Sequence, residues 1–245
     1  MSLTRRRLVL ASAAYVLLSG CRSTPPPAPK PTTPEQARYL ESRERMLKRF
    51  GRPGFELVVD AMDGQEFLGV EFFPEHAKYP FYQRGGQRLQ TQGKRMLSQP
   101  VPERVRVVWR DSSAREFVQG VGGRYAGNII GDEIIEVGSR IPQALIDDLK
   151  RDPRGNLRLK FRMSEQGTLF GWDIERRPGY DAKAAQRAVM ELKPYPHVRP
   201  VYSFIGGDFR EATYTDNIVD GRIVRTHHKG WYIDKRTGRK IETDY

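Results

Sequence analysis

The single cysteine of this 245-residue chain, Cys21, constrains what the chain can fold into more than any other residue. Without a second cysteine no disulfide can form within the chain, so the fold has to rest on its hydrophobic core. Cys21 also follows three arginines, Arg5 to Arg7, and a short apolar stretch, Leu8 to Leu18. This order is typical of a secretory signal peptide. The stretch is too short for a membrane span, which needs about 20 apolar residues.

The run Leu18-Ser19-Gly20-Cys21 resembles the lipobox of bacterial lipoproteins. In that family the cysteine thiol takes a diacylglycerol, the signal is cut before the cysteine, and the new amino group is acylated. The resemblance implies a signal peptide at residues 1–20, cleavage between Gly20 and Cys21, and lipidation of Cys21. Arg22 stands where an aspartate would favour inner-membrane retention, which implies the periplasmic face of the outer membrane. The alternative is a buried cysteine after an N-terminal helix.

The charge balance points to an anionic partner. The formal net charge is +12, and the signal removes three arginines and no acid. A basic chain usually suggests a nucleic-acid partner. Because the signal peptide predicts export, away from the cell's nucleic acid, we expect no nucleic-acid partner here. Anionic lipid head groups, lipopolysaccharide phosphates or an acidic protein are better counter-charges. Dispersed arginines that only solvate the surface are the alternative.

The sequence after Cys21 predicts a tether and then a helix. Residues 21–33 are rich in proline, which favours an extended polyproline spacer. Residues 34–51 form the expected helix, with Thr33 as its cap, Pro34 in its first turn and Gly51 as its stop. Leu40, Leu47 and Phe50 would share its apolar face.

Residues 52–245 predict a β-rich periplasmic domain. Asp63-Gly64 indicates a hairpin between strands at 55–59 and 67–72, and residues 74–102 read as a long loop. Residues 104–110 alternate as a half-buried strand. Further hairpins are expected at 157–174, 218–224 and 231–242, weak strands at 114–138, and short helices at 142–150 and 181–192. We therefore expect a β-rich α+β fold with antiparallel, sandwich-like sheets and two or three peripheral helices.

No pattern in the chain predicts catalysis, a metal or a cofactor. His227 and His228 are adjacent and would point to opposite faces of a strand. Asp173 and Glu175 would lie on the outer face of a strand opposite basic residues, where cross-strand ion pairing explains them better than acid–base chemistry. We expect no enzyme. An envelope hydrolase is the minor alternative, and it would need a pocket that gathers carboxylates or a Ser–His pair.

Exposed aromatic and basic residues in the long loop are the candidate partner-binding residues: Tyr79, Phe81, Tyr82 and Arg84. Tyrosine and arginine are enriched at the energetic centres of protein interfaces. The same composition could instead hold the loop against the core.

Two segments, Pro102–Arg110 and Leu169–Pro178, are similar to uncharacterised lipoproteins found beside type VI secretion lipase effectors. The strand of alternating basic and apolar residues that ends in Trp109-Arg110 is the main likeness. The resemblance implies a periplasmic immunity protein that binds and blocks an incoming phospholipase. The alternative is a structural or assembly lipoprotein that binds lipopolysaccharide, peptidoglycan or another envelope protein.

Overall fold

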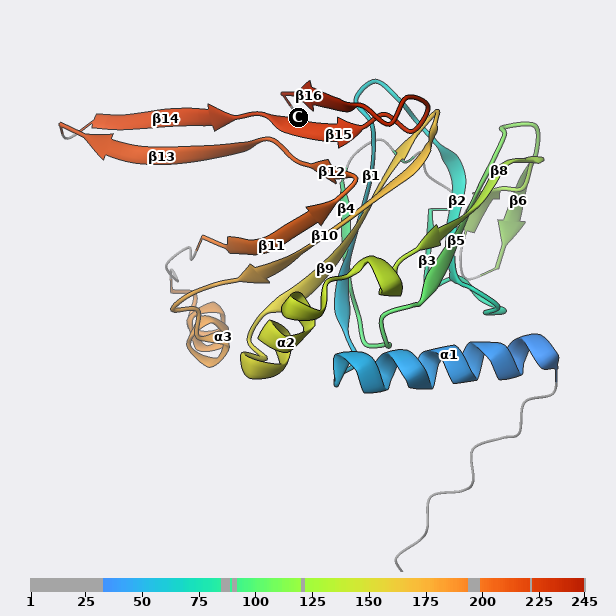
Figure 1. Ribbon diagram of the computed structural model, residues 1–245, viewed down its shortest axis with the longest axis horizontal. Helices are drawn as coiled ribbons and strands as arrows, with labels where there is room; N and C mark the ends of the chain where they lie inside the picture. The colour runs from blue at the N-terminus through green and yellow to red at the C-terminus, as the bar shows by residue number, and fades with distance from the viewer. Residues whose placement is uncertain are drawn as a thin grey trace, which may run out of the picture. The chain divides into compact units, whose positions relative to one another are not determined.

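The computed structural model describes residues 33–84, 89, 92–119, 122–193, 199–220 and 222–244. They all belong to one compact unit, which spans residues 32–245. Within them the chain forms a β-rich α+β fold of mostly antiparallel sheets with three α-helices, as the sequence predicts (Figure 1). The predicted signal peptide, its cut after Gly20, the lipidated Cys21 and the tether up to residue 32 lie outside the described residues.

The elements follow one another along the chain as α1 (Pro34–Phe50), β1 (Phe55–Ala61), β2 (Leu68–Pro74), β3 (Tyr82–Arg84), β4 (Gly93–Leu97), β5 (Arg104–Arg110), β6 (Arg115–Val118), β7 (Gly122–Tyr125), β8 (Ile129–Glu136), the 3₁₀ turn η1 (Gly138–Arg140), α2 (Gln143–Arg151), β9 (Asn156–Ser164), β10 (Gly167–Arg176), α3 (Ala182–Met190), β11 (Val201–Gly207), β12 (Phe209–Arg210), β13 (Thr213–Val219), β14 (Arg222–His228), β15 (Gly230–Ile233) and β16 (Lys240–Thr243).

Helix α1 begins and ends where its capping residues predict. The Thr33 hydroxyl accepts a hydrogen bond from the Gln36 amide at 3.2 Å, and Gly51 closes the helix in the left-handed conformation. Met46 and Phe50 are the buried residues of the helix. Leu47, which was expected on the buried face, is 40 % exposed. The predicted face is therefore confirmed at Phe50 and wrong at Leu47, and Met46 takes a buried place that was not predicted.

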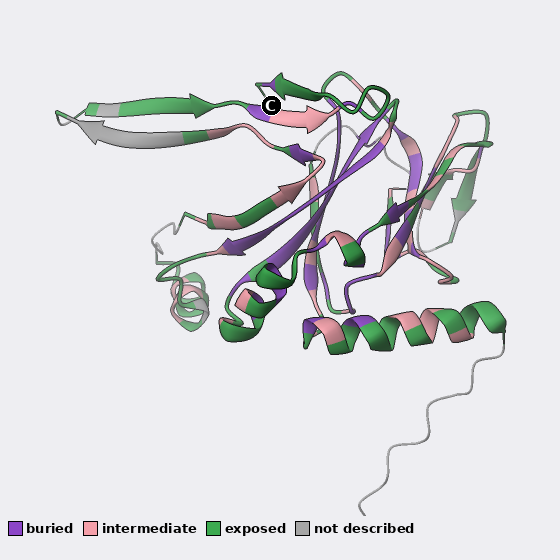
Figure 2. Ribbon diagram, viewed as in Figure 1, coloured by how far each residue is buried: buried purple, intermediate pink, exposed green. Residues whose placement is uncertain are grey.

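The hydrophobic core lies between two sheets. A five-stranded sheet has the order β11-β10-β9-β1-β4, and a four-stranded sheet has the order β3-β2-β5-β8. Phe72 on β2 meets Phe161 on β9 with ring centroids 5.3 Å apart, and Phe161 continues to Phe170 at 5.1 Å. The strands β1, β9 and β10 are buried over most of their length (Figure 2). Helix α2 adds Leu145, Ile146 and Leu149 to the same core.

The predicted hairpin around Asp63-Gly64 is wrong. Both strands form, but β1 pairs with β4 and β9 while β2 pairs with β3 and β5, so the turn carries the chain from one sheet to the other. Strand β1 runs parallel to β9, although only antiparallel pairs were expected. Its residues are buried on both faces, which is typical of a strand inside a sheet rather than of an edge hairpin.

The predicted long loop at 74–102 is also only partly a loop. Two short strands lie within it, β3 beside β2 and β4 beside β1. Both are edge strands with mixed burial, and such strands carry too weak an alternation to be read from sequence. The weak strands expected between 114 and 138 are the β6–β7 hairpin and β8.

The other predicted hairpins and short helices are confirmed. They are β9–β10, β13–β14, β15–β16, α2 and α3. Strands β12, β15 and β16 form a small third sheet. The β13–β14 hairpin, residues 213–228, extends away from it as a two-stranded ribbon, which we call the arm (Figure 1).

Candidate functional site

The structure separates the four candidate partner-binding residues. Tyr79 is 70 % exposed and Lys78 lies over its ring, with Nζ 5.2 Å from the centroid. Phe81 and Tyr82 are buried and contact Phe72 at ring distances of 6.4 and 5.8 Å. The Arg84 Nε donates to the Tyr82 hydroxyl at 2.8 Å. Phe81 and Tyr82 therefore hold the segment against the core, and only Tyr79 presents its ring to solvent.

The arm is a two-stranded ribbon, and in one of its strands every described side chain is exposed. Every residue of β14 whose exposure is described, Arg222 and residues 224–228, is exposed, so β14 has no buried face there (Figure 2). A two-stranded hairpin without a covering layer is at best marginally stable in water. The arm thus has the geometry of an element that gains a covering surface from a partner.

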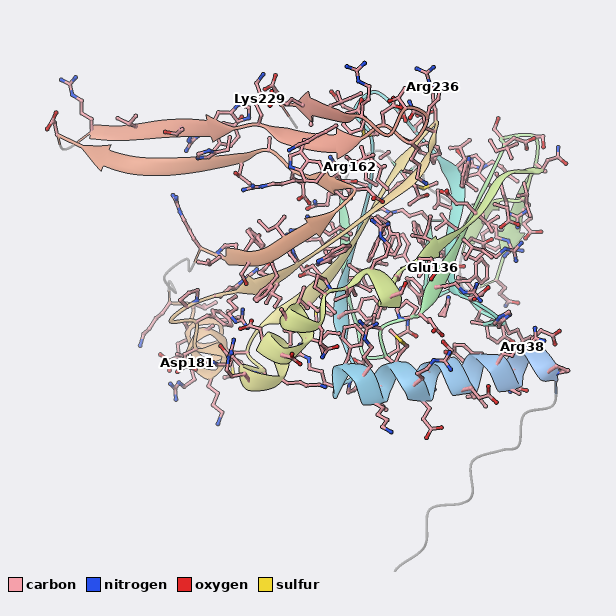
Figure 3. All side chains as sticks on the ribbon, viewed as in Figure 1. Arg38, Glu136, Arg162, Asp181, Lys229 and Arg236 are labelled. Atoms are coloured by element: carbon pink, nitrogen blue, oxygen red, sulfur yellow. The ribbon has the colours of Figure 1, made fainter. Side chains whose placement is uncertain are left out.

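Aromatic, aliphatic and basic side chains are interleaved along the arm. Tyr214 is 63 % exposed and stacks on His227 with ring centroids 4.7 Å apart, and the Arg225 guanidinium lies 5.8 Å from the Tyr214 centroid. Val224 is 46 % exposed, and Lys229 stands at the root of the arm (Figure 3). Exposed tyrosine and arginine on one projecting element are the residue types that dominate protein interfaces.

Strand β11 presents a free edge near the arm. It pairs with β10 on one side, and no other described strand pairs with its outer edge. A bulge places Phe204 and Ile205 opposite Asp173, and Phe204 has a φ of 53°, a strained value for a bulky residue. Phe204 and Ile205 are 40 % and 38 % exposed. An open edge with exposed apolar side chains is a template for pairing with a strand of another protein.

Buried charges fix the root of the arm to the five-stranded sheet. Lys160 on β9 is completely buried, and its Nζ lies 2.6 Å from Glu211 Oε2 and 3.2 Å from Asp173 Oδ2. Glu211 comes two residues before the first residue of β13. Arg162 lies under the third sheet, 4.6 Å from the Phe209 ring centroid, and forms a bidentate pair with Asp60 (Figure 3).

The cross-strand ion pairs of Asp173 and Glu175 were predicted on an outer face of the sheet. The pairing is confirmed, but the predicted exposure is wrong. Arg158 donates twice to Asp173 at 2.6 Å, yet both residues are buried, and the Tyr202 ring of β11 lies against Arg158 with its centroid 4.2 Å from the guanidinium carbon. Burial alone would lower the pKa of Arg158. The hydrogen bonds and the negative charge of Asp173 outweigh this effect and raise the pKa of Arg158. Burial alone would raise the pKa of Glu211; the Lys160 ammonium outweighs it and lowers that pKa.

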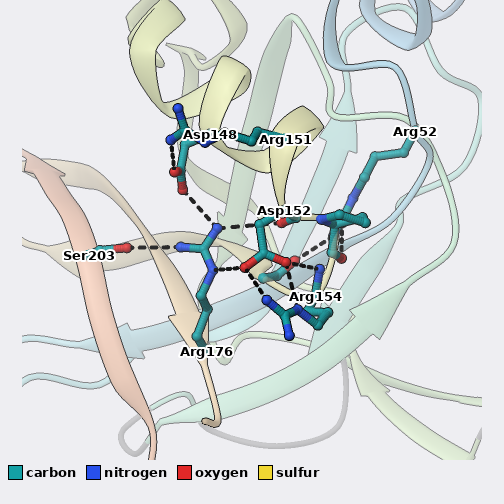
Figure 4. A network of polar contacts seen from close by, with 9 residues as sticks. Arg52, Asp148, Arg151, Asp152, Arg154, Arg176 and Ser203 are labelled. Atoms are coloured by element: carbon teal, nitrogen blue, oxygen red, sulfur yellow. Dashed lines mark hydrogen bonds and ion pairs between the residues drawn. The ribbon is translucent and has the colours of Figure 1, made fainter.

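An arginine cluster fixes the opposite end of the same sheet (Figure 4). The Arg176 guanidinium, at the end of β10, donates to Asp148 of α2 at 2.7 Å and to the Ser203 hydroxyl of β11 at 3.3 Å. Its Nε lies 3.4 Å from Asp152 Oδ2 but makes no hydrogen bond. Arg52 donates to the carbonyls of Pro153 and Gly155 at 2.7 and 2.8 Å. Burial lowers the pKa of Arg52, and Arg176 adds to this by repulsion.

A cleft of about 610 Å³ opens beside this cluster. Glu56, Asp152 and Glu175 contribute carboxylates to its lining, and Arg154 and Arg177 contribute guanidinium groups. The Arg154 hydrogen bond lowers the pKa of Asp152 to about 2. Burial, followed by repulsion from Glu175, raises the pKa of Glu56. The cleft therefore holds carboxylates in two different electrostatic states.

Neither a membrane-spanning helix nor a metal-binding group is found in the described part of the chain. None of its helices combines the length and apolarity needed to cross a bilayer. No group of three or more His, Cys, Asp and Glu side chains there has the geometry to hold a metal ion. Searches of protein-family models, curated proteins and solved structures found no match to this chain.

Sequence reasoning missed the arm, the β11 edge and the cleft as functional features. The hairpin was expected, but its isolation depends on which elements fail to cover it, and that is a property of the tertiary structure. One signal was present: the predicted strands near 218–224 carry charged and polar residues on both sides, as a ribbon exposed on both faces requires.

Proposed function

We propose that this protein is a lipid-anchored periplasmic binding lipoprotein whose arm and β11 edge bind a protein partner. The single observation that carries the proposal is the arm, a seven-residue strand pair that projects from the body with no covering layer on the described side chains of β14. Its root is fixed by the buried Lys160–Glu211 pair. A rigid base with an exposed aromatic and basic ribbon suits recognition of a preformed surface.

The partner we propose is a secreted phospholipase-type effector, which the protein would block as an immunity protein. The resemblance of the 102–110 and 169–178 segments to lipoproteins encoded beside such effectors supports this choice. The arm carries Arg222 and Arg225, and Lys229 follows directly after it, so an acidic patch on the effector would complement this charge. Acylation of Cys21 would hold the protein at the membrane that a phospholipase attacks.

The test uses the full chain and the phospholipase effector encoded next to its gene. Cells that direct the effector to the periplasm should survive when they also make this protein, and the two proteins should purify together. In a variant with Tyr214→Ala, Val224→Ser and Arg225→Glu we expect a loss of affinity of at least about 30-fold, since even one residue at the energetic centre of an interface contributes about 2 kcal/mol or more. Protection should be lost with it.

Phe117→Ala is the matched control, because it removes an aromatic side chain of β6, 79 % exposed, that lies outside the arm and was not a candidate partner-binding residue. It should leave binding and protection unchanged. Wild-type protein that neither binds nor protects would rule out the effector, and an arm variant that binds as tightly as wild type would rule out the arm.

The anchor has its own test. Mass spectrometry of the mature protein should show an acylated N-terminal Cys21, and Cys21→Ala should leave the precursor uncut and unacylated. An intact start with a free thiol would overturn the anchor and the compartment together.

A further inference from the structure

We propose that the cleft between the 152–156 turn and the 176–180 loop binds an uncharged saccharide. None of the residues that line the cleft belongs to the arm, and the inference does not depend on the identity of the protein partner. The cleft lies where β1, β4, β9 and β10 meet two loops, and its volume of about 610 Å³ is within the range of about 300–1,000 Å³ found for small-molecule sites.

The framework of the cleft is rigid. Arg52 holds the carbonyls of Pro153 and Gly155, and Arg176 ties the end of β10 to Asp148 on α2 (Figure 4). These contacts fix one wall of the cleft through charge-assisted hydrogen bonds, which are stronger than neutral ones. A site fixed in this way is largely formed before a ligand arrives, which reduces the ordering cost of binding.

The lining has no net charge. Glu56, Asp152 and Glu175 stand against Arg154, Arg176 and Arg177. A phosphate would meet three carboxylates, and a polyamine or metal cation would meet three guanidinium groups. Neither sign of charge is favoured, so a neutral ligand fits better than an ion.

The polar groups of the lining suit a molecule rich in hydroxyl groups. The Arg177 side chain is 52 % exposed and uses its Nε on Glu175, so it retains further N–H donors. Among the described residues, no side-chain hydrogen bond holds Glu56 or Asn156, so both offer polar side-chain atoms to the cleft. The Glu56 carboxyl group accepts hydrogen bonds, and the Asn156 amide both donates and accepts.

Tyr180 and Met96 supply the apolar part of the wall. They are 46 % and 59 % exposed and line the same cleft. A sugar ring has apolar C–H faces as well as a polar rim, and an amphipathic tyrosine ring can pack against such a face. Donors, acceptors and an apolar surface in one neutral cleft are the combination that a saccharide requires.

The experiment titrates the full-length protein, purified in detergent, with two probes by calorimetry: chitotriose, which has the N-acetylglucosamine repeat of cell-wall glycan, and maltotriose as a neutral sugar without the acetamido group. We expect saturable binding of at least one of them. Glu56→Gln and Tyr180→Ala should each weaken it by about tenfold or more, because each removes a contact of about 1.5 kcal/mol. Tyr79→Ala, outside the cleft, should bind as wild type does.

Binding of chitotriose alone would point to a cell-wall source, and binding of both sugars to a general saccharide site. The proposal is overturned if neither sugar binds at millimolar concentration, if inorganic phosphate or spermidine binds there instead, or if both cleft variants bind as wild type. The arm variant described above should keep full sugar binding, so failure of the effector hypothesis and failure of this one are distinguishable.

Discussion

The Lys160 ammonium lies 2.6 Å from the Glu211 carboxylate, and this pair joins the middle strand of the five-stranded sheet to the root of the arm. Lys160 also lies 3.2 Å from Asp173. One buried ammonium group therefore pairs with two carboxylates, one on the neighbouring strand β10 and one at the root of the arm. An ion pair of this kind adds little net stability, but it imposes a strict geometry, since either charge left alone is costly. We infer that it sets the position of the projecting hairpin.

Lys160→Ala should therefore destabilise the fold by about 3–5 kcal/mol, because Asp173 and Glu211 lose their shared cation. Urea unfolding measures the change. Lys94→Ala, an exposed lysine on β4, is the control and should stay within about 0.5 kcal/mol of wild type. Lys160→Met combined with Glu211→Leu should recover part of the loss. Equal effects of Lys160→Ala and Lys94→Ala would contradict this role.

The backbone of the arm should exchange its amide hydrogens far faster than that of β9 and β10. The arm has only one pair of strands, and the described side chains of β14 are all exposed, whereas β9 and β10 are buried along most of their length. Hydrogen-exchange mass spectrometry of peptides from 213–228 and 157–174 tests this directly. Binding of the partner should slow exchange in the first set. Equally slow exchange in both sets, without a partner, would show that the arm is stabilised in another way.

Much of the fold could be predicted from local signals. The capping residues of α1 and the alternating pattern of β9 and β10 require no tertiary information, and both were correct. The pairing of β1 could not be predicted, because Asp63-Gly64 makes a turn whether or not the flanking strands pair. Strand β1 pairs with β9, about 100 residues away, and the local sequence of neither strand indicates such a long-range partner.

The candidate site was less predictable than the fold. Phe81 and Tyr82 have the composition of an interface, and only their position against Phe72 shows that they are core residues. Conversely, Arg158 and Lys160 read as exposed charges, because sequence alternation does not show that a further layer covers the second face of the sheet. Exposure and burial of these residues depend on contacts with elements distant in the sequence.

Gly207→Ala should destabilise the β11 edge by about 2–6 kcal/mol. Gly207 has a φ of 113°, and an added Cβ would lie 2.3 Å from the Phe170 carbonyl oxygen. Backbone strain of about 1–3 kcal/mol and overpacking of about 1–3 kcal/mol both contribute. Gly64→Ala separates the two effects, since its φ is 74° and an added Cβ there meets nothing within 4 Å. Thermal melts of the two variants should differ, and equal melting temperatures would show that β11 yields to the new methyl group.

Glu56→Gln should stabilise the protein at neutral pH although it weakens sugar binding. The folded state raises the pKa of Glu56 above the ordinary value of 4.5, so the folded protein holds this proton more tightly than the unfolded chain. Stability therefore falls as the pH rises from 4.5 through the folded pKa and stays lower above it. Melting temperatures of wild type and variant should converge at pH 4 and separate by pH 7. A variant that is less stable at pH 7 would contradict the cause assigned to the shift.

Asp152 should make the opposite contribution at acid pH. Hydrogen bonds from Arg154 lower its pKa from 3.8 to about 2, so the folded state favours the ionised form. This stabilisation is fully present above the unfolded pKa and is lost as the pH falls through about 2. Asp152→Asn should therefore flatten the decline in stability between about pH 4 and pH 2, followed by urea unfolding at each pH. Asp63→Asn, in the exposed turn after β1, changes the net charge equally and should leave the decline as steep as in wild type. If both variants flatten it alike, general charge repulsion rather than the Arg154 contact governs the acid response of the 152–156 turn.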